Sequence, residues 1–179
     1  MEIQASRAGA RVTASGEPVL LLEQDRSRWD QLLIRRGLAT LERAESLAAS
    51  RGSYTLQAAI AACHARARTA EETDWHRIAE LYRELAELTR SPIVGLNRAV
   101  AVSMAFGPAI GLDLVDALRD EPSLAGYHLY PAVRADLLTK LGRASEARAE
   151  LTRAASLTRN ERERALLLER AERLAGATS

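Results

Sequence analysis

Strong helix formers dominate this sequence, and they recur in segments that are separated by short breaks. Ala, Leu, Arg and Glu predominate, whereas aromatic residues make up 4% of the chain. A core of small and aliphatic side chains suits closely packed helices better than a β-sandwich, whose strands favour Val, Thr, Tyr and Phe. Apolar spacing and the Gly, Pro and Ser breaks predict helices at 25–50, 54–68, 74–89, 92–106, 108–119, 127–141, 144–157 and 160–175. We therefore expect an all-α protein built as an antiparallel stack of helical hairpins.

The N-terminal segment, residues 1–22, is predicted to differ from the rest. Met1–Arg7 has the pattern of the end of a helix whose beginning is missing. Between residues 11 and 20, two short runs with β-branched residues flank a Ser-Gly pair, which predicts a small β-hairpin. This gives a linker helix and β-hairpin at 1–22, a helical domain at 23–175 and a disordered tail at 176–179.

A weak internal repeat indicates the geometry of the stack. Gly107 and Gly142 lie 35 residues apart, and each falls at a break between two predicted helices. This spacing is close to the roughly 34-residue period of the tetratricopeptide repeat (TPR). Small residues such as Ala135 and Ala147 would let paired helices approach closely, and the glycine would make the sharp turn. We predict a TPR-like stack, chiefly in its middle and last units.

The charge balance argues against nucleic acid as a partner. The chain has 25 basic and 24 acidic residues, a net charge of +1, and these alternate along the predicted helices. The single cysteine, Cys63, excludes an internal disulfide and fits a reducing compartment. No apolar run is long enough to span a bilayer, and Met1–Arg7 lacks the apolar core of a signal peptide. We expect a cytoplasmic protein that binds neither DNA nor membranes by itself.

No constellation of residues points to catalysis. Cys63 and His64 are adjacent, but neighbours on a helix project about 100° apart, which is poor geometry for chelating a metal. The sequence contains neither a Gly-rich phosphate loop nor a Gly-x-Ser-x-Gly nucleophile elbow. We expect a protein that is not an enzyme and that holds no metal or cofactor.

A first candidate contact surface lies at the start of the first long predicted helix. In Glu23–Asp30 two arginines, Arg26 and Arg28, lie between Asp25 and Trp29. Trp and Arg are favoured anchors of protein interfaces. The same residues could instead form a capping and ion-pair network that attaches the N-terminal hairpin to the helices, because acids are expected at helix N-termini. The sequence leaves both interpretations open.

Two further candidates depend on the hairpin stack. The first helix of each hairpin in such stacks lines a concave groove, where Asn97 and Arg98 could bind the backbone and carboxylate of an extended peptide. Arg134, near the start of the corresponding helix in the next unit, could join them. Gln57 and His64 lie two turns apart on one helical face that could line the same groove. The alternatives are helix–helix hydrogen bonding within the fold and an ordinary solvent-facing stripe.

Several segments, in this order, resemble one known domain. They are Glu23–Asp30, Tyr54–Ala62, Thr73–Trp75, Ser91–Ala101, Gly126–Leu129 and Leu157–Glu161. Together they are similar to the C-terminal TPR-like extension of a group of bacterial extracytoplasmic-function (ECF) sigma factors. The family's Asp-Gln-Asp-Arg signature corresponds here to Glu23-Gln24-Asp25-Arg26. The resemblance covers about Met1 to Leu174.

The resemblance implies a regulatory role in transcription initiation. In that family the extension follows two sigma domains, which bind RNA polymerase and the promoter, and it tunes sigma activity without a conventional anti-sigma factor. Neither sigma domain is present in this sequence, so we expect an excised regulatory domain or a shortened gene product. Its expected partners are its own sigma domains and RNA polymerase. The alternative is a free-standing TPR-like adaptor that binds an extended peptide.

Overall fold

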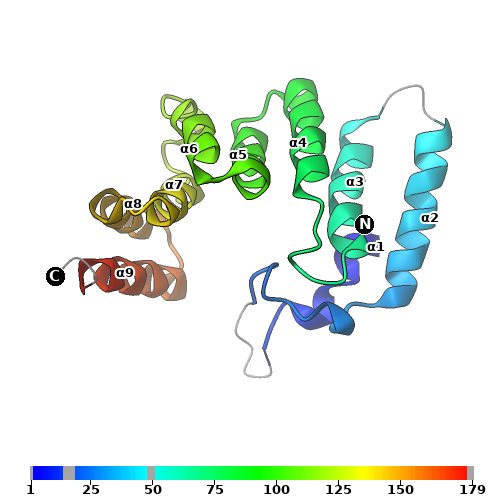
Figure 1. Ribbon diagram of the computed structural model, residues 1–179, viewed down its shortest axis with the longest axis horizontal. Coiled ribbons are helices and arrows are strands. Elements are labelled where there is room, and N and C mark those ends of the chain that lie inside the picture. The colour runs from blue at the N-terminus through cyan, green and yellow to red at the C-terminus, as the bar shows by residue number, and fades with distance from the viewer. Residues whose placement is uncertain (1, 14–18, 48–50, 177–179) are drawn as a thin grey trace. The chain divides into compact units, whose positions relative to one another are not determined.

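The computed structural model describes residues 2–13, 19–47 and 51–176, and its regular structure in these ranges is helical (Figure 1). This confirms the predicted all-α class for the described residues. Three short 3-10 turns, η1 (Ala8–Ala10), η2 (Arg26–Arg28) and η3 (Pro122–Leu124), accompany the α-helices. The α-helices are α1 (Glu2–Ala5), α2 (Gln31–Leu47), α3 (Ser53–Arg66), α4 (Trp75–Thr89), α5 (Pro92–Phe106), α6 (Pro108–Asp116), α7 (Leu129–Lys140), α8 (Ala144–Leu157) and α9 (Glu161–Gly176).

The predicted β-hairpin is wrong for the part of it that the structure describes. Residues 11–13 and 19–20 form no strand, and one backbone hydrogen bond, from Val19 N–H to the Arg11 carbonyl, joins them at 2.8 Å. The predicted Ser15-Gly16 turn lies outside the described residues. A two-stranded ribbon needs further strands or a packed face to persist, and the described part of the chain offers no sheet to extend.

The main part of the helix predicted at 25–50 starts after Asp30, the residue that the sequence suggested as the N-cap of that part. Residues 25–29 form η2 and its flanks, and α2 starts at Gln31 because Asp30 caps it. The Asp30 carboxylate accepts hydrogen bonds from the backbone N–H groups of Leu32 and Leu33 at 2.9 and 3.0 Å, as an N-cap should.

Contacts between Cα atoms group the chain into two compact units, Met1–Leu88 and Thr89–Ser179. This division falls at the last residue of α4, between Leu88 and Thr89. The predicted C-terminal tail begins at Gly176, which is the last residue of α9, and its remaining residues lie outside the described ranges.

In the first unit α2 and α3 run side by side in opposite directions, and α1 packs against both (Figure 1). The α1–α2 contact depends on a missing side chain. A Cβ atom added at Gly37 would lie 2.5 Å from Ile3 Cγ1, so only glycine admits Ile3 at this point. Ala10, Trp29 and Ile34 form a small core beneath, with Leu21 and Ala65 packed on it.

In the second unit each helix packs mainly against the next one along the chain. One core cluster joins α5, α6 and α7 around Leu96, Val115 and Tyr130, and another joins α8 and α9 around Leu151 and Leu167. No helix in the described residues is both long enough and apolar enough to cross a lipid bilayer.

The two glycines of the predicted repeat lie at turns between helices, as the sequence indicated. Gly107, between α5 and α6, has φ of +102°, and Gly142, between α7 and α8, has φ of +73°. Side chains other than glycine rarely adopt such backbone angles, so both turns require the residue that the sequence supplies.

Close packing of α6 on α5 predicts opposite outcomes for two Gly-to-Ala changes. At Gly111 a Cβ atom would collide with Ser103 Cβ and would lie 3.0 Å from the Ala99 carbonyl oxygen. Gly111→Ala should therefore lower the free energy of unfolding by about 2 kcal/mol. At Gly95 the nearest atoms are flexible Leu118 methyls at 3.4 Å, so Gly95→Ala should raise it by up to about 1 kcal/mol. Urea denaturation of both variants measures the two effects, and equal shifts would contradict the close α5–α6 contact.

Candidate functional site

The segment Glu23–Asp30, here called the entry segment, is held by its own local hydrogen bonds. The Asp25 carboxylate accepts from the Ser27 N–H at 2.9 Å and from the Ser27 hydroxyl at 2.7 Å, which caps η2. These bonds lower the pKa of Asp25 below its usual range. Asp25 itself is exposed, and the tight turn that it stabilises directs the next residue, Arg26, inward.

Arg26 joins three parts of the first unit. Its side chain is 8% exposed, and its Nη1 donates to the carbonyls of His64 and Ala67, each at 2.9 Å. Its Nη2 donates to the Thr73 hydroxyl at 2.8 Å. Because the two carbonyls lie at the C-terminal end of α3, the guanidinium also meets the negative end of that helix. Burial lowers the pKa of Arg26, but guanidinium groups remain protonated in proteins.

Trp29 and His64 complete a buried cluster around Arg26. The guanidinium carbons of Arg26 and Arg7 lie 5.3 and 5.7 Å from the centre of the Trp29 ring, which is within cation–π range. The His64 ring meets the Trp75 ring edge-on, with centroids 5.3 Å apart. Burial, together with the charges of Arg26 and Arg7, lowers the pKa of His64 to about 4, so the imidazole is neutral at physiological pH.

The structure separates the entry-segment candidates into buried and exposed residues. Arg26 and Trp29 are buried and bonded or packed within the unit, so they present no surface to a partner. This favours the network interpretation for both of them. Arg28 is exposed and donates from Nη2 to the Gly9 carbonyl at 2.6 Å. Asp25 and Arg28 are therefore the members of this candidate set that a partner could reach.

Gln57 and His64 both lie on α3, but their side chains lie in different environments. His64 belongs to the buried cluster, whereas Gln57 is exposed and lines a groove between α2 and α3. The groove has a volume of about 580 Å³. Apolar side chains supply most of its wall, including Ile3, Leu41 and Tyr54.

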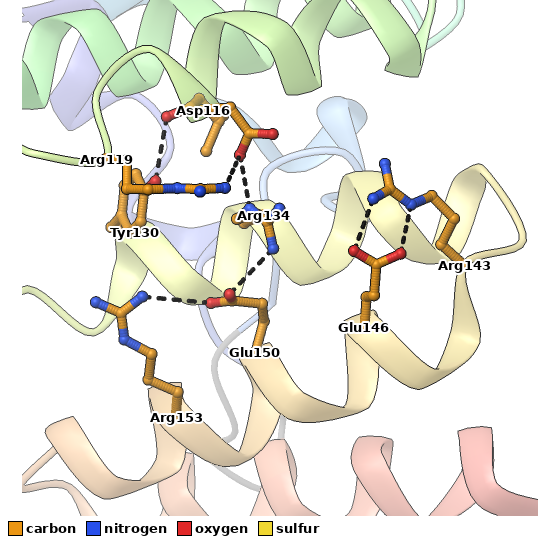
Figure 2. Close-up of polar contacts among 9 residues, drawn as sticks. Asp116, Arg119, Tyr130, Arg134, Arg143, Glu146, Glu150 and Arg153 are labelled. Atoms are coloured by element: carbon orange, nitrogen blue, oxygen red, sulfur yellow. Dashed lines mark hydrogen bonds and ion pairs between the residues drawn. The ribbon is translucent and has the colours of Figure 1, made fainter.

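Arg134 is bound within the second unit rather than offered to a ligand. Its side chain is 8% exposed, and its Nε donates to Asp116 at 2.7 Å while its Nη1 donates to Glu150 at 3.0 Å (Figure 2). The hydrogen bond that Arg134 donates to Asp116 raises the pKa of Arg134 above its usual value. Arg119 pairs with Asp116 at 3.6 Å and Arg153 with Glu150 at 3.7 Å, so the network links α6, α7 and α8.

Asn97 and Arg98 do not share this network. Asn97 is exposed on α5, and Arg98 is half-buried, with an Nε that has no hydrogen-bond partner among the described residues. The structure therefore gives no joint site of Asn97, Arg98 and Arg134, because the donors of Arg134 are committed to Asp116 and Glu150.

Sequence reasoning missed the partners of the two buried arginines. Thr73, Asp116 and Glu150 each lie well over ten residues from the arginine that they bind. One signal was available for Arg134: α7 is otherwise apolar around it, with Tyr130, Ala135 and Leu138 buried. An arginine inside such a helix needs an acid from a neighbouring element.

One protein family matches the N-terminal part of the chain, and one bacterial protein matches nearly all of it. A family of unknown function (DUF6596) matches residues 1–45, which hold α1, the entry segment and most of α2. An uncharacterised protein of Rhizobium meliloti (strain 1021) is 45% identical over 173 residues, or 97% of this chain. The chain spans 40% of the length of that relative. No solved structure matches the chain. Within the described ranges, no three His, Cys, Asp or Glu side chains are grouped so as to hold a metal ion.

Removing the Arg26 side chain should destabilise the first unit. Arg26→Ala leaves the His64 and Ala67 carbonyls and the Thr73 hydroxyl without their donor, and it uncovers one face of Trp29. We expect a loss of about 3 kcal/mol in the free energy of unfolding. Arg28→Ala, which removes one exposed hydrogen bond, should cost under about 1 kcal/mol. Chemical denaturation compares the two variants, and similar costs would show that Arg26 is not a structural centre.

The buried His64 should make the protein less stable in mild acid. In the unfolded chain His64 gains a proton as the pH falls through about 6.5, whereas the folded chain resists protonation until about pH 4. Stability is therefore full above pH 6.5 and declines between pH 6.5 and 4, by up to about 3 kcal/mol from this group. His64→Phe should flatten that decline, and a change at the exposed His76 should not. Denaturation midpoints between pH 4 and 7.5 measure the slopes, and parallel slopes for wild type and His64→Phe would contradict the assignment.

Proposed function

We propose that this chain is a regulatory domain of the ECF sigma-factor type, which modulates transcription initiation through contacts with sigma domains or RNA polymerase. The proposal includes no enzymatic activity and no direct binding of DNA by these residues. It places the protein in the cytoplasm, where RNA polymerase acts. The fold that goes with it is a TPR-like stack, supported by the positive φ angles of Gly107 and Gly142, which lie 35 residues apart.

One observation carries the proposal: three segments of the resemblance meet in space. Arg26 of the entry segment bonds to the C-terminal end of α3, the helix that includes Tyr54–Ala62, and to Thr73 of Thr73–Trp75. The imidazole of His64 then contacts Trp75. Segments that are similar to one domain in sequence thus support one another through specific bonds. This supports reading them as parts of a single inherited structure rather than as separate short matches.

The length of the relative agrees with the proposal. More than half of the R. meliloti protein lies outside the matched region, since the chain spans 40% of it. A sigma factor with an extension of this kind needs further domains to bind polymerase and promoter, and the relative has the length for them.

Exposed leucines next to the entry segment supply a contact surface. Leu20 is 69% exposed and Leu22 is 42% exposed, whereas Leu21 between them packs on the small core around Trp29. Leu20 and Leu22 therefore expose apolar surface immediately before the entry segment, in which Asp25 and Arg28 are also exposed. Such mixed surfaces are typical of protein interaction sites.

A chimera tests the proposal. The matched region of the R. meliloti relative is replaced by this chain, and the chimera is added to core RNA polymerase and a set of genomic promoters. We expect promoter-dependent transcripts, and we expect Leu20→Asp with Leu22→Asp to change their yield about threefold or more, because charge disrupts an apolar contact. Leu166→Asp with Leu168→Asp on α9, at 54% and 40% exposure, is the matched control and should have little effect.

Two outcomes would count against the proposal. If the chimera and the intact relative neither bind core polymerase nor start transcription, the sigma-factor role fails. If both start transcription and the Leu20 and Leu22 variant behaves as the α9 control does, with unchanged thermal stability, the proposed contact edge is wrong.

The peptide-binding adaptor has less support. It relied on Asn97, Arg98 and Arg134 acting together, and Arg134 bonds instead to Asp116 and Glu150. Of these three residues, Asn97 is the one that is exposed.

A further inference from the structure

The groove beside Gln57 follows the interface of α2 and α3. Its α2 wall runs from Gly37 to Ala44, and its α3 wall runs from Ala61 back to Tyr54. Glu2, Ile3 and Gln4 of α1 are also part of its lining. The groove is therefore continuous with the interface at which α1 already packs on α2 and α3.

Two contacts fix the direction of α1 along α2. The Ser6 carbonyl accepts from the Asp30 N–H at 2.9 Å, just before α2 begins. Ile3 lies against Gly37, about two turns further along α2. Read from Ser6 back to Ile3, the chain thus advances along α2, and the axis of α1 leads on its N-terminal side toward Thr40 and Ala44. α1 also contacts α3.

The walls of the groove suit a helix. Gly37, Ala44, Ala58 and Ala61 are small, and small residues allow helix backbones to approach closely. At the far end the apolar surface stays uncovered: Tyr54 is 86% exposed, and Leu47, one turn beyond Ala44, is 80% exposed. These are the two most exposed large apolar side chains among the described residues.

We propose that this groove is the docking site of an amphipathic helical segment that continues α1 on its N-terminal side in a longer polypeptide. The distance from Gly37 to Ala44 corresponds to about seven residues, or two helical turns, of the docked segment. Its apolar side chains would fall four and seven positions before Ile3, on the face that Ile3 presents to Gly37. The inference rests on the proposed function, because it takes this chain as the extension of a larger protein.

The size of the groove favours a segment of the same polypeptide over a separate partner. Two helical turns cover far less than the roughly 800 Å² per partner that stable complexes bury. A free peptide or a second copy would also lose translational and rotational freedom on binding. A segment that is covalently joined to α1 avoids this entropic cost, because its docking is intramolecular. Covalent continuity with α1 therefore makes a short contact sufficient.

Cysteine labelling tests the inference. Thr40→Cys places a thiol in the groove, and Ala39→Cys places one on the exposed surface of α2 outside the groove lining. Both are made with Cys63→Ala, which removes the native buried thiol. A maleimide reagent is applied to this chain alone and to the chimera with the R. meliloti relative. In the chimera we expect Thr40→Cys to react about tenfold more slowly than in the chain alone, with Ala39→Cys unchanged.

A designed extension supplies a second measurement that does not need the relative. Seven residues of helix-forming sequence are added before Met1, with leucines four and seven positions before Ile3. We expect the extended chain to have a higher melting temperature than a control of the same composition with the leucines moved to the outward face. Ala58→Glu, which puts a charge into the groove, should abolish the difference.

Equal labelling of Thr40→Cys in chain and chimera would overturn the proposal, as would equal melting temperatures of the two extensions. Neither readout depends on transcription. Protection of Thr40→Cys in a chimera without sigma activity would keep the groove assignment and reject the proposed function. Transcription by a chimera whose groove stays reactive would do the reverse.

Discussion

Close approach of neighbouring helices depends on alanine and glycine at the points of contact. Ala62, Ala99, Ala135, Ala147 and Ala154 have no exposed surface, and Gly111 and Gly37 lie where even a methyl group would collide with a neighbour. Such residues lose little side-chain entropy on burial, and they let backbones approach until leucine side chains from both helices interlock. A chain with 4% aromatic residues can therefore still fill its core.

Two buried arginines connect elements that apolar packing alone would not position. Arg26 satisfies the open carbonyls at the end of α3 and reaches Thr73, while Arg134 holds acids from α6 and α8. Each guanidinium has lost much of its water, so its direct hydrogen bonds replace hydration with protein partners. The fan of five donors on arginine makes this possible, and lysine with its single ammonium could not reach the same sets of acceptors.

Local patterns predicted much of the fold, and tertiary partners decided the rest. The break at Gly142 and the absence of breaks over 144–157 placed α8 at the bounds that the structure shows, and Asp74 and Pro92 marked the starts of α4 and α5. Val12, Thr13 and Val19 are β-branched and favoured strands, but the described residues 11–13 and 19–20 form none, because strand propensity has effect only where a sheet exists to join. The 3-10 turn η2 was likewise not predicted, because the residues at 25–29 lie next to a strong helix-forming pattern and were included in the predicted helix.

The candidate site residues show the same contrast between what local sequence predicts and what tertiary partners decide. The sequence identified Asp25, Arg26 and Trp29 as candidate site residues. It could not distinguish a contact surface from an internal network, because the partners of Arg26 are the distant residues 64, 67 and 73. Arg134 was predicted to line a groove because its two acidic partners, Asp116 and Glu150, could not be identified from the sequence. The sequence analysis did not single out Gly37. The need for glycine there is evident only from the structure, in which the Ile3 side chain occupies the space that a Cβ atom would fill.

The chain of neighbour contacts in the second unit has a consequence for how that unit forms. Its main contacts join α5 with α6, α6 with α7, α7 with α8 and α8 with α9, so most of its packing closes short loops. Low contact order of this kind permits rapid folding from an interior hairpin outward. The same arrangement makes the unit nearly one-dimensional: α9, which packs mainly against α8, should open and close without the loss of α5 and α6.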